Sequence, residues 1–217
     1  NWLFGVSSDW SNAALWSTNP NYPNNGTPAG VTYRVTTPVG SYFLTLDQNV
    51  TIDSLTMNGG QLNIVNKNLS VLGAVTLNGA SRMSLDSANL IGGTYNVGAS
   101  GNGFRIARTS NWMSGLTING NVNVVTGQGH INLAGVTIRD GLTLNGVWTC
   151  GLSRAFLSFE GTQTLSGNST IAFAGTDSLR RVLAVTRGST LTLSPTSIIR
   201  GGYADFNGEG ETGNHGT

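Results

Sequence analysis

The stretch Leu55-Thr56-Met57-Asn58-Gly59 recurs along this chain and decides its fold. Close copies stand at 75–79, 116–120 and 142–146, looser copies at 163–167 and 191–195, and a degenerate copy at 94–96. The Thr of each copy is 18 to 28 residues from the next, with a mean of about 23. A pattern that returns at a roughly fixed period indicates one structural unit stacked along an axis, with loops of varying length.

Short runs of apolar, polar and apolar residues lie between the copies, as in Val50-Thr51-Ile52, Leu62-Asn63-Ile64 and Leu69-Ser70-Val71. This alternation is typical of a strand that has one buried face. Three such strands fit into each period of about 23 residues. The sequence therefore predicts an all-β fold, a right-handed parallel β-helix (β-solenoid) whose turns stack about 4.8 Å apart.

Asn-Gly pairs such as 58–59, 78–79 and 119–120 leave a second topology open. In a hairpin this pair forms a tight turn between antiparallel strands, which would give a long meander or a β-sandwich. The solenoid is favoured because the pair recurs once per period, after the same Thr-apolar pair.

The first forty residues differ from the repeats, because they hold Trp2, Trp10, Trp16 and four of the five prolines. An irregular, aromatic-rich segment can cover the open strand edges and the core at the end of a solenoid. We therefore predict an N-terminal cap over 1–40, the parallel β-helix over 41–200, and a C-terminal tail or assembly segment over 201–217.

The composition excludes two classes of partner. Charged residues make up 10% of the 217 residues and the net charge is +1, so the sequence predicts no surface for nucleic acid. No run approaches the roughly 20 apolar residues of a membrane span, which predicts no membrane insertion. Cys150, the only cysteine, lies in an apolar stretch and is interpreted as a small core residue.

Two segments carry a family resemblance. The first runs from Gly5 through Asp9-Trp10-Ser11-Asn12-Ala13-Ala14-Leu15-Trp16, and the second spans 44–57. They resemble the start of secreted bacterial β-strand-repeat surface proteins, the autotransporter-associated and PEP-CTERM-type proteins with a haemagglutinin-like β-helix. The resemblance implies an extracellular or cell-surface location and a role in adhesion or scaffolding, and it carries over no catalytic residue.

The predicted function is that of an extracellular structural or adhesive module, and not of an enzyme. The open strand edges at the ends of a parallel coil can pair with another copy, which predicts end-to-end self-association into filaments. Surface glycans or proteins are the other expected partners.

A carbohydrate-binding or carbohydrate-active β-helix, similar to a polysaccharide lyase or hydrolase, is the alternative. Its candidate residues are His130, Arg139 and Asp140, with Trp112 and Trp148 as aromatic platforms for a glycan. Both Trp residues lie in apolar contexts, so packing in the core is the competing interpretation.

A calcium site is a further candidate. Asp205, Asn207, Glu209 and Glu211 place oxygen ligands at alternate positions, as in the first half of a calcium loop. Gly216 stands where the acidic ligand of the twelfth position belongs, which favours a solvated acidic tail and no cofactor.

The repeated Thr lies between two inward apolar residues and is expected to face outward. If the turns align, one outer column forms from Thr56, Thr76, Thr94, Thr117, Thr143, Thr164 and Thr192. A Thr array can order water and bind ice, but the uneven spacing favours the interpretation that Thr simply suits stacked strands.

Overall fold

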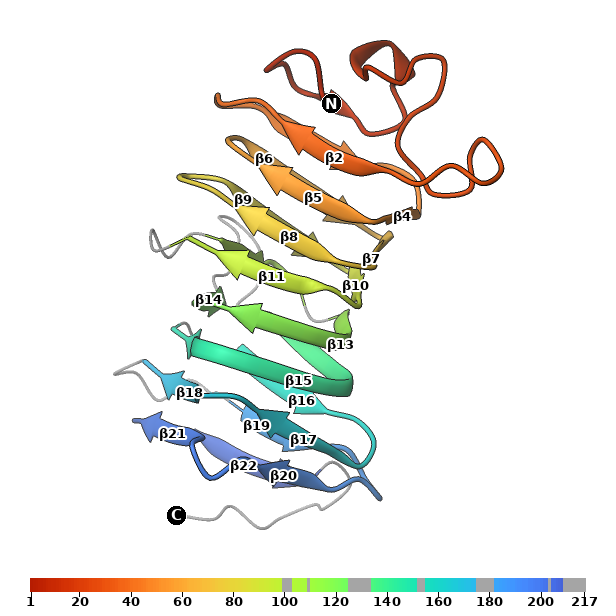
Figure 1. Cartoon of the computed structure of the whole chain (residues 1–217). Coiled ribbons are helices and arrows are strands. Elements are labelled where there is room, and N and C mark those ends of the chain that lie inside the picture. The colour runs from red at the N-terminus through yellow and green to blue at the C-terminus, as the bar shows by residue number, and fades with distance from the viewer. Residues whose placement is uncertain are drawn as a thin grey trace.

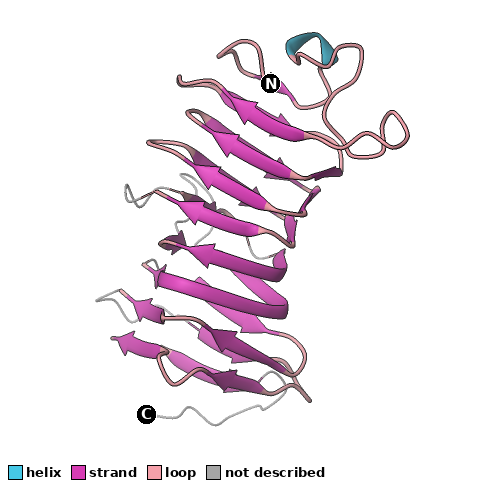
Figure 2. Ribbon diagram, in the orientation of Figure 1, coloured by secondary structure: helices cyan, strands magenta, loops and turns pink. Residues whose placement is uncertain are grey.

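A computed structural model gives the architecture of the chain. The structure describes residues 1–98, 103–108, 110–124, 134–151, 155–174, 182–202 and 204–208, with Asn207 and Gly208 described by their backbone only. The described chain is a parallel β-solenoid with three strands per turn (Figures 1 and 2). In Figure 1 the chain descends from the N-terminus while the front strands run from right to left, so the coil is right-handed.

The strands stack into three faces. Face 1 carries the repeated Thr and consists of β2 (Arg34–Thr37), β5 (Ser54–Met57), β8 (Ala74–Leu77), β11 (Thr94–Val97), the second part of β13 (Asn111–Asn119), the middle of β15 (Ala134–Cys150), β17 (Gln163–Ser166) and β20 (Leu191–Leu193).

Face 2 follows face 1 in every turn. It consists of β1 (Ser8–Asp9), β3 (Phe43–Leu46), β6 (Gln61–Val65), β9 (Arg82–Asp86), β12 (Phe104–Ile106), β14 (Val122–Val124), the last part of β15, β18 (Ser169–Phe173) and β21 (Ile198–Gly201).

Face 3 completes the turn. It consists of β4 (Val50–Ile52), β7 (Asn68–Val71), β10 (Asn89–Ile91), the first parts of β13 and β15, β16 (Ala155–Phe159), β19 (Val182–Val185) and β22 (Asp205–Gly208).

Every described pairing between these strands is parallel, which rules out the antiparallel meander for this part of the chain. The Asn-Gly pairs at 58–59, 78–79, 119–120 and 145–146 turn the chain from face 1 to face 2, and at three of them, Gly59, Gly120 and Gly146, the glycine allows close stacking. A Cβ on Gly146 would lie 2.1 Å from the carbonyl oxygen of Gly120 in the turn before it. The recurrence of Asn-Gly at one phase therefore reflects tight corners and not hairpins.

The interior is a column of apolar side chains. Leu55, Val75 and Tyr95 occupy the same inward position of face 1 in three successive turns, and all three are buried. Cys150 is also buried, as expected. Each such side chain contributes about 1.5–3 kcal/mol through burial. No helix in the described ranges is long and apolar enough to cross a membrane.

Asparagine ladders tie the turns together on the outside. Asn145 Nδ2 donates to Asn119 Oδ1, and Asn119 Nδ2 donates to Asn96 Oδ1, both at 2.9 Å. A second ladder joins Asn78 to Asn58, also at 2.9 Å. Each asparagine side chain thus satisfies its neighbour, so that the ladder reinforces the register of the coil.

The expected single Thr column is divided in the structure. Thr56 pairs with Thr76, but the next partner of Thr76 is Asn96 and not Thr94. Thr94 instead begins a second column with Thr117, two residues out of step with the first. The slip keeps every side chain on its own side of the strand, because its length equals the two-residue repeat of a strand.

The predicted aromatic cap is present at the N-terminal end. The ring centroids of Trp2 and Trp16 are 4.8 Å apart, those of Trp10 and Trp16 are 4.9 Å apart, and all three residues are buried. The one described helical element, η1 (Ala13–Leu15), lies between Trp10 and Trp16 in the chain and has no buried residue. Trp10 Nε1 donates to the carbonyl of Pro23 at 2.8 Å.

The cap also covers the open edge of each face in the first turn. The backbone N–H of Trp2 donates to Thr36 on β2, that of Trp10 to Thr45 on β3, and that of Asn25 to Thr51 on β4. The coil begins within the range predicted for the cap, since β2 starts at Arg34, and it continues past residue 200 into β22.

Candidate functional site

The predicted glycan residues Trp112 and Arg139 meet on the outer side of face 3, near its corner with face 1. The guanidinium carbon of Arg139 lies 5.2 Å from the centroid of the Trp112 ring. Arg139 also forms an ion pair with Glu160, because its Nε and a terminal nitrogen each lie 2.8 Å from Glu160 Oε2. The two carboxylate contacts hold the guanidinium beside the indole, and they neutralise its charge.

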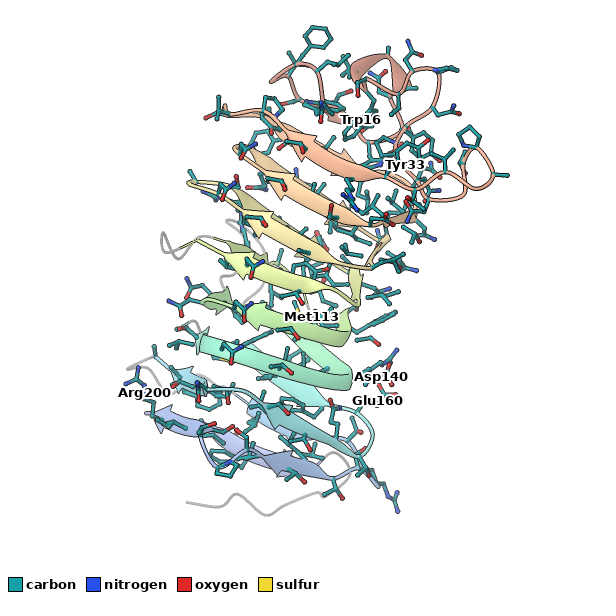
Figure 3. The ribbon with its side chains drawn as sticks, viewed as in Figure 1. Trp16, Tyr33, Met113, Asp140, Glu160 and Arg200 are labelled. Carbon is teal, nitrogen blue, oxygen red and sulfur yellow. The ribbon has the colours of Figure 1, made fainter. Side chains whose placement is uncertain are left out.

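Asp140 occupies the corner itself. Its backbone is left-handed, with φ 56°, and the flanking corner positions are Gly115 and Gly141 with φ 63° and 90°. Ser114 Oγ donates to Asp140 Oδ2 at 2.5 Å. In Figure 3 Asp140 and Glu160 lie one below the other along the same edge of the coil.

The glycine corners leave a shallow hollow of about 250 Å³ beside Asp140 on face 1. Hydroxyl groups line it, from Thr117, Thr143, Thr164 and Ser166. The hollow thus presents neutral donors and acceptors with one carboxylate at the rim, which is a surface suited to hydroxylated ligands.

Trp148, the other predicted aromatic platform, is not available at the surface. Its side chain is 0% exposed, since it stacks in the core between Val122 and Ile171 of the neighbouring turns. The proposed role of Trp148 in glycan contact is therefore wrong, and the core interpretation holds. His130 lies outside the described residues.

The calcium candidate is not supported by the part that the structure describes. Asp205 and Asn207 belong to the extended strand β22, which pairs with β19, whereas a calcium loop curls around its ion. Glu209 and Glu211 lie outside the described residues. Within the described ranges no group of three His, Cys, Asp or Glu residues is placed to hold a metal ion.

A second hollow, of about 290 Å³, lies on face 2 near the cap, and none of the residues predicted for a site belongs to it. Phe43, Gln61 and Arg82 follow one another across β3, β6 and β9 and are among the residues that line it. Phe43 is 55% exposed although Leu44 beside it is buried. The sequence signal for an exposed ring was that Phe43 is two residues from Thr45 on β3 and therefore points outward with it.

Tyr42 and Gly60 support this second hollow. Tyr42 is buried, and its hydroxyl donates to the carbonyl of Pro38 at 3.0 Å. Burial raises the pKa of the Tyr42 hydroxyl above its ordinary value. A Cβ on Gly60 would lie 2.6 Å from the Tyr42 ring, so the glycine is what allows the ring to pack here.

Comparison with known proteins adds no relative to this picture: no family model, no curated protein and no solved structure matches the chain.

Proposed function

We propose that the protein is an extracellular structural or adhesive module with no enzymatic activity. The observation that carries this proposal is the division of the molecule into a continuous apolar core and an outer surface of stacked amide and hydroxyl groups. Such a surface offers many weak contacts along one direction, which suits attachment and spacing more than chemistry on a bound substrate.

The corner carboxylates illustrate why catalysis is not favoured. Glycoside hydrolysis needs two carboxyl groups that flank the scissile bond, one of them as an acid. Glu160 is paired with Arg139, and Asp140 accepts a hydrogen bond from Ser114. The charges are thus used to hold the corner together.

Self-association through the ends is part of the proposal. Leu193 and Phe206 occupy inward positions of the last described turn, opposite Leu165 and Leu183, yet they are 39% and 52% exposed. A second copy stacked on this end would bury them and extend the parallel ladders.

Attachment of protein-coated beads tests the adhesive function. Beads carrying the full chain are placed on surfaces of cellulose, chitin, pectate and mucin, with albumin-coated beads as the control. Attachment above the control on at least one surface supports the proposal. Attachment to none of them, or release of new reducing ends or unsaturated sugars from any polysaccharide, contradicts it.

Sedimentation velocity over a concentration series tests self-association. Growth of large species with concentration, abolished by Phe206→Asp but retained in Leu72→Asp, supports stacking through the end. Leu72 is a fair control because it is 71% exposed and lies away from both ends. A single monomeric species at all concentrations contradicts end-to-end assembly.

Carbohydrate binding at the Asp140 corner is a second candidate, favoured by the hydroxyl-lined hollow. The ligand expected there is a neutral glycan, because Glu160 already neutralises Arg139 and Asp140 would repel an acidic sugar. Loss of binding to neutral oligosaccharides in Asp140→Asn together with Thr143→Val would support it, and unchanged binding would contradict it.

A further inference from the structure

The hollow over Phe43, Gln61 and Arg82 brings together an aromatic ring, an amide and a guanidinium group that has no carboxylate partner among the described residues. The three residues take equivalent outward positions in three successive turns, so their Cα atoms are about 4.8 Å from one turn to the next. A half-exposed aromatic ring, an amide and a guanidinium group thus stand in one row along the axis of the solenoid.

Small residues open the space beside this row. Gly40, Gly60 and Ala80 line the hollow and project little or nothing into it. The floor is fixed by the backbone ladder, in which Gly60 N–H donates to Gly40, Gln61 N–H to Tyr42, and Arg82 N–H to Gly60. The site is therefore formed in advance, which lowers the entropic cost of binding.

Arg82 brings an uncompensated positive charge to the hollow. The two ion pairs of the described residues are Arg108 with Asp86 and Arg139 with Glu160, and neither involves Arg82. Asp86 shares the outward phase of Arg82 on β9, but it pairs with Arg108 at 2.8 Å. An anionic group is therefore the complement that this hollow lacks.

Gln61 defines the rest of the ligand. Its Nε2 donates to Asn63 Oδ1, which orients the amide and leaves its carbonyl oxygen as an acceptor. An acceptor for hydroxyl groups beside an aromatic ring matches a sugar, whose C–H face packs on the ring while its hydroxyls find polar partners.

We propose that this hollow binds a carboxylated sugar unit of an acidic polysaccharide. Its C–H face packs on Phe43, its hydroxyl groups bond to Gln61, and its carboxylate pairs with Arg82. The inference deepens the proposed adhesive function by naming a ligand class and a site, and it rests on that function for its biological meaning.

Calorimetric titration of the full chain with trigalacturonate tests the proposal, with the fully methyl-esterified trimer as the matched neutral ligand. We expect the acid to bind at least about tenfold more tightly than the ester, because a hydrogen bond between charged groups is roughly twice as strong as one between neutral groups. Added salt is expected to weaken binding of the acid and leave that of the ester unchanged.

Variants locate the site. Phe43→Ala and Arg82→Gln should each weaken trigalacturonate binding by about tenfold or more, whereas Phe43→Tyr and Arg82→Lys should retain most of it. Arg105→Gln is the matched control, since Arg105 is a partly buried outward arginine of face 2 on β12, away from the lining of the hollow. An unchanged circular dichroism spectrum shows that each variant is folded.

Three results would overturn the inference: equal binding of the acid and the ester, equal weakening by Arg105→Gln and Arg82→Gln, or tighter binding of phenylacetate at the same site, which would indicate an aromatic acid or a peptide side chain. The two proposals fail separately. If trigalacturonate binds through Arg82 but the beads attach to no surface, the binding site is supported and the adhesive function is contradicted. If the beads still attach to every surface after Arg82→Gln and Phe43→Ala, the adhesive function is supported and the role of this site is contradicted.

Discussion

Arg139 and Trp112 belong to successive turns of face 3, and the guanidinium carbon of the first lies 5.2 Å from the ring centroid of the second. The contact spans two neighbouring strands and is anchored at its far side by Glu160. It therefore links three turns of the coil through one side chain, on the surface and not in the core.

Arg139→Gln is expected to loosen this corner with little effect on global stability. A cation–π contact at an exposed site contributes about 0.5–1 kcal/mol, and an exposed ion pair contributes about as much or less. The indole of Trp112 should become more accessible, so iodide quenching of tryptophan fluorescence should increase. The increase should vanish in the Trp112→Phe background, and a loss of several kcal/mol in unfolding free energy would show that the pair is structural.

Trp16→Ala is expected to destabilise the N-terminal end strongly. The indole is fully buried between Trp2 and Trp10, and its Nε1 donates to the carbonyl of Trp10 at 2.7 Å. Removal of a buried Trp costs about 3–5 kcal/mol. Urea unfolding measures the loss, with Phe4→Ala, an exposed aromatic of the same segment, expected to change stability by less than about 0.5 kcal/mol.

If Trp16→Ala behaves like Phe4→Ala, the aromatic cluster does not cap the coil. If the cap is required, its loss should also expose the edges of β2, β3 and β4 to solvent. Amide hydrogen exchange should then be faster at these three strands than at β15.

Asn119→Ala tests the ladder on the outside of the coil. Asn119 donates to Asn96 and accepts from Asn145, so its removal breaks one hydrogen bond to each neighbouring turn. We expect a loss of about 0.5–1.5 kcal/mol, because water can reach the freed amide groups on this outer surface. Asn168→Ala is the control, because Asn168 is exposed and the bond at this position is made by its backbone N–H. Equal effects of the two variants would mean that the ladder contributes nothing.

The alternation of apolar and polar residues was enough to predict the fold and the buried positions. It was not enough to predict the register, that is, which residues of neighbouring turns pair. Leu55 and Met57 were placed inward by their phase alone, which the structure confirms. The same alternation predicts that Trp148 points inward, because Trp148 is two residues from the core residue Cys150 and must point to the same side of the strand. The motif aligned Thr94 with Thr76, but a slip of two residues satisfies the same alternation.

The outward position of Phe43 could be read from the sequence, but the row of residues that forms the hollow could not, for the same reason. Gln61 is 18 residues from Phe43 and Arg82 is 21 residues from Gln61, and only the register of β3, β6 and β9 brings them into one row. Loops of variable length hide that register from the sequence.

Tyr95→Phe is expected to stabilise the protein. Tyr95 is fully buried in the core, and its hydroxyl has no hydrogen-bond partner within the described residues. An unsatisfied buried polar group costs about 1–3 kcal/mol, so its removal should raise the unfolding free energy by about 1 kcal/mol at neutral pH. Tyr33→Phe should do the opposite, because the Tyr33 hydroxyl donates to the carbonyl of Thr27 at 2.6 Å.

The same substitution should change the response to alkali. Burial raises the pKa of Tyr95 in the folded state well above its ordinary value of 10.0. Above pH 10 the unfolded chain therefore loses this proton while the folded chain keeps it, so stability falls as the pH rises, by about 1.4 kcal/mol per unit from this group. Urea unfolding between pH 8 and 11, a range set by the ordinary Tyr value, should show a shallower decline in Tyr95→Phe than in the wild type. Parallel declines would indicate that Tyr95 ionises as readily in the folded state as in the unfolded one.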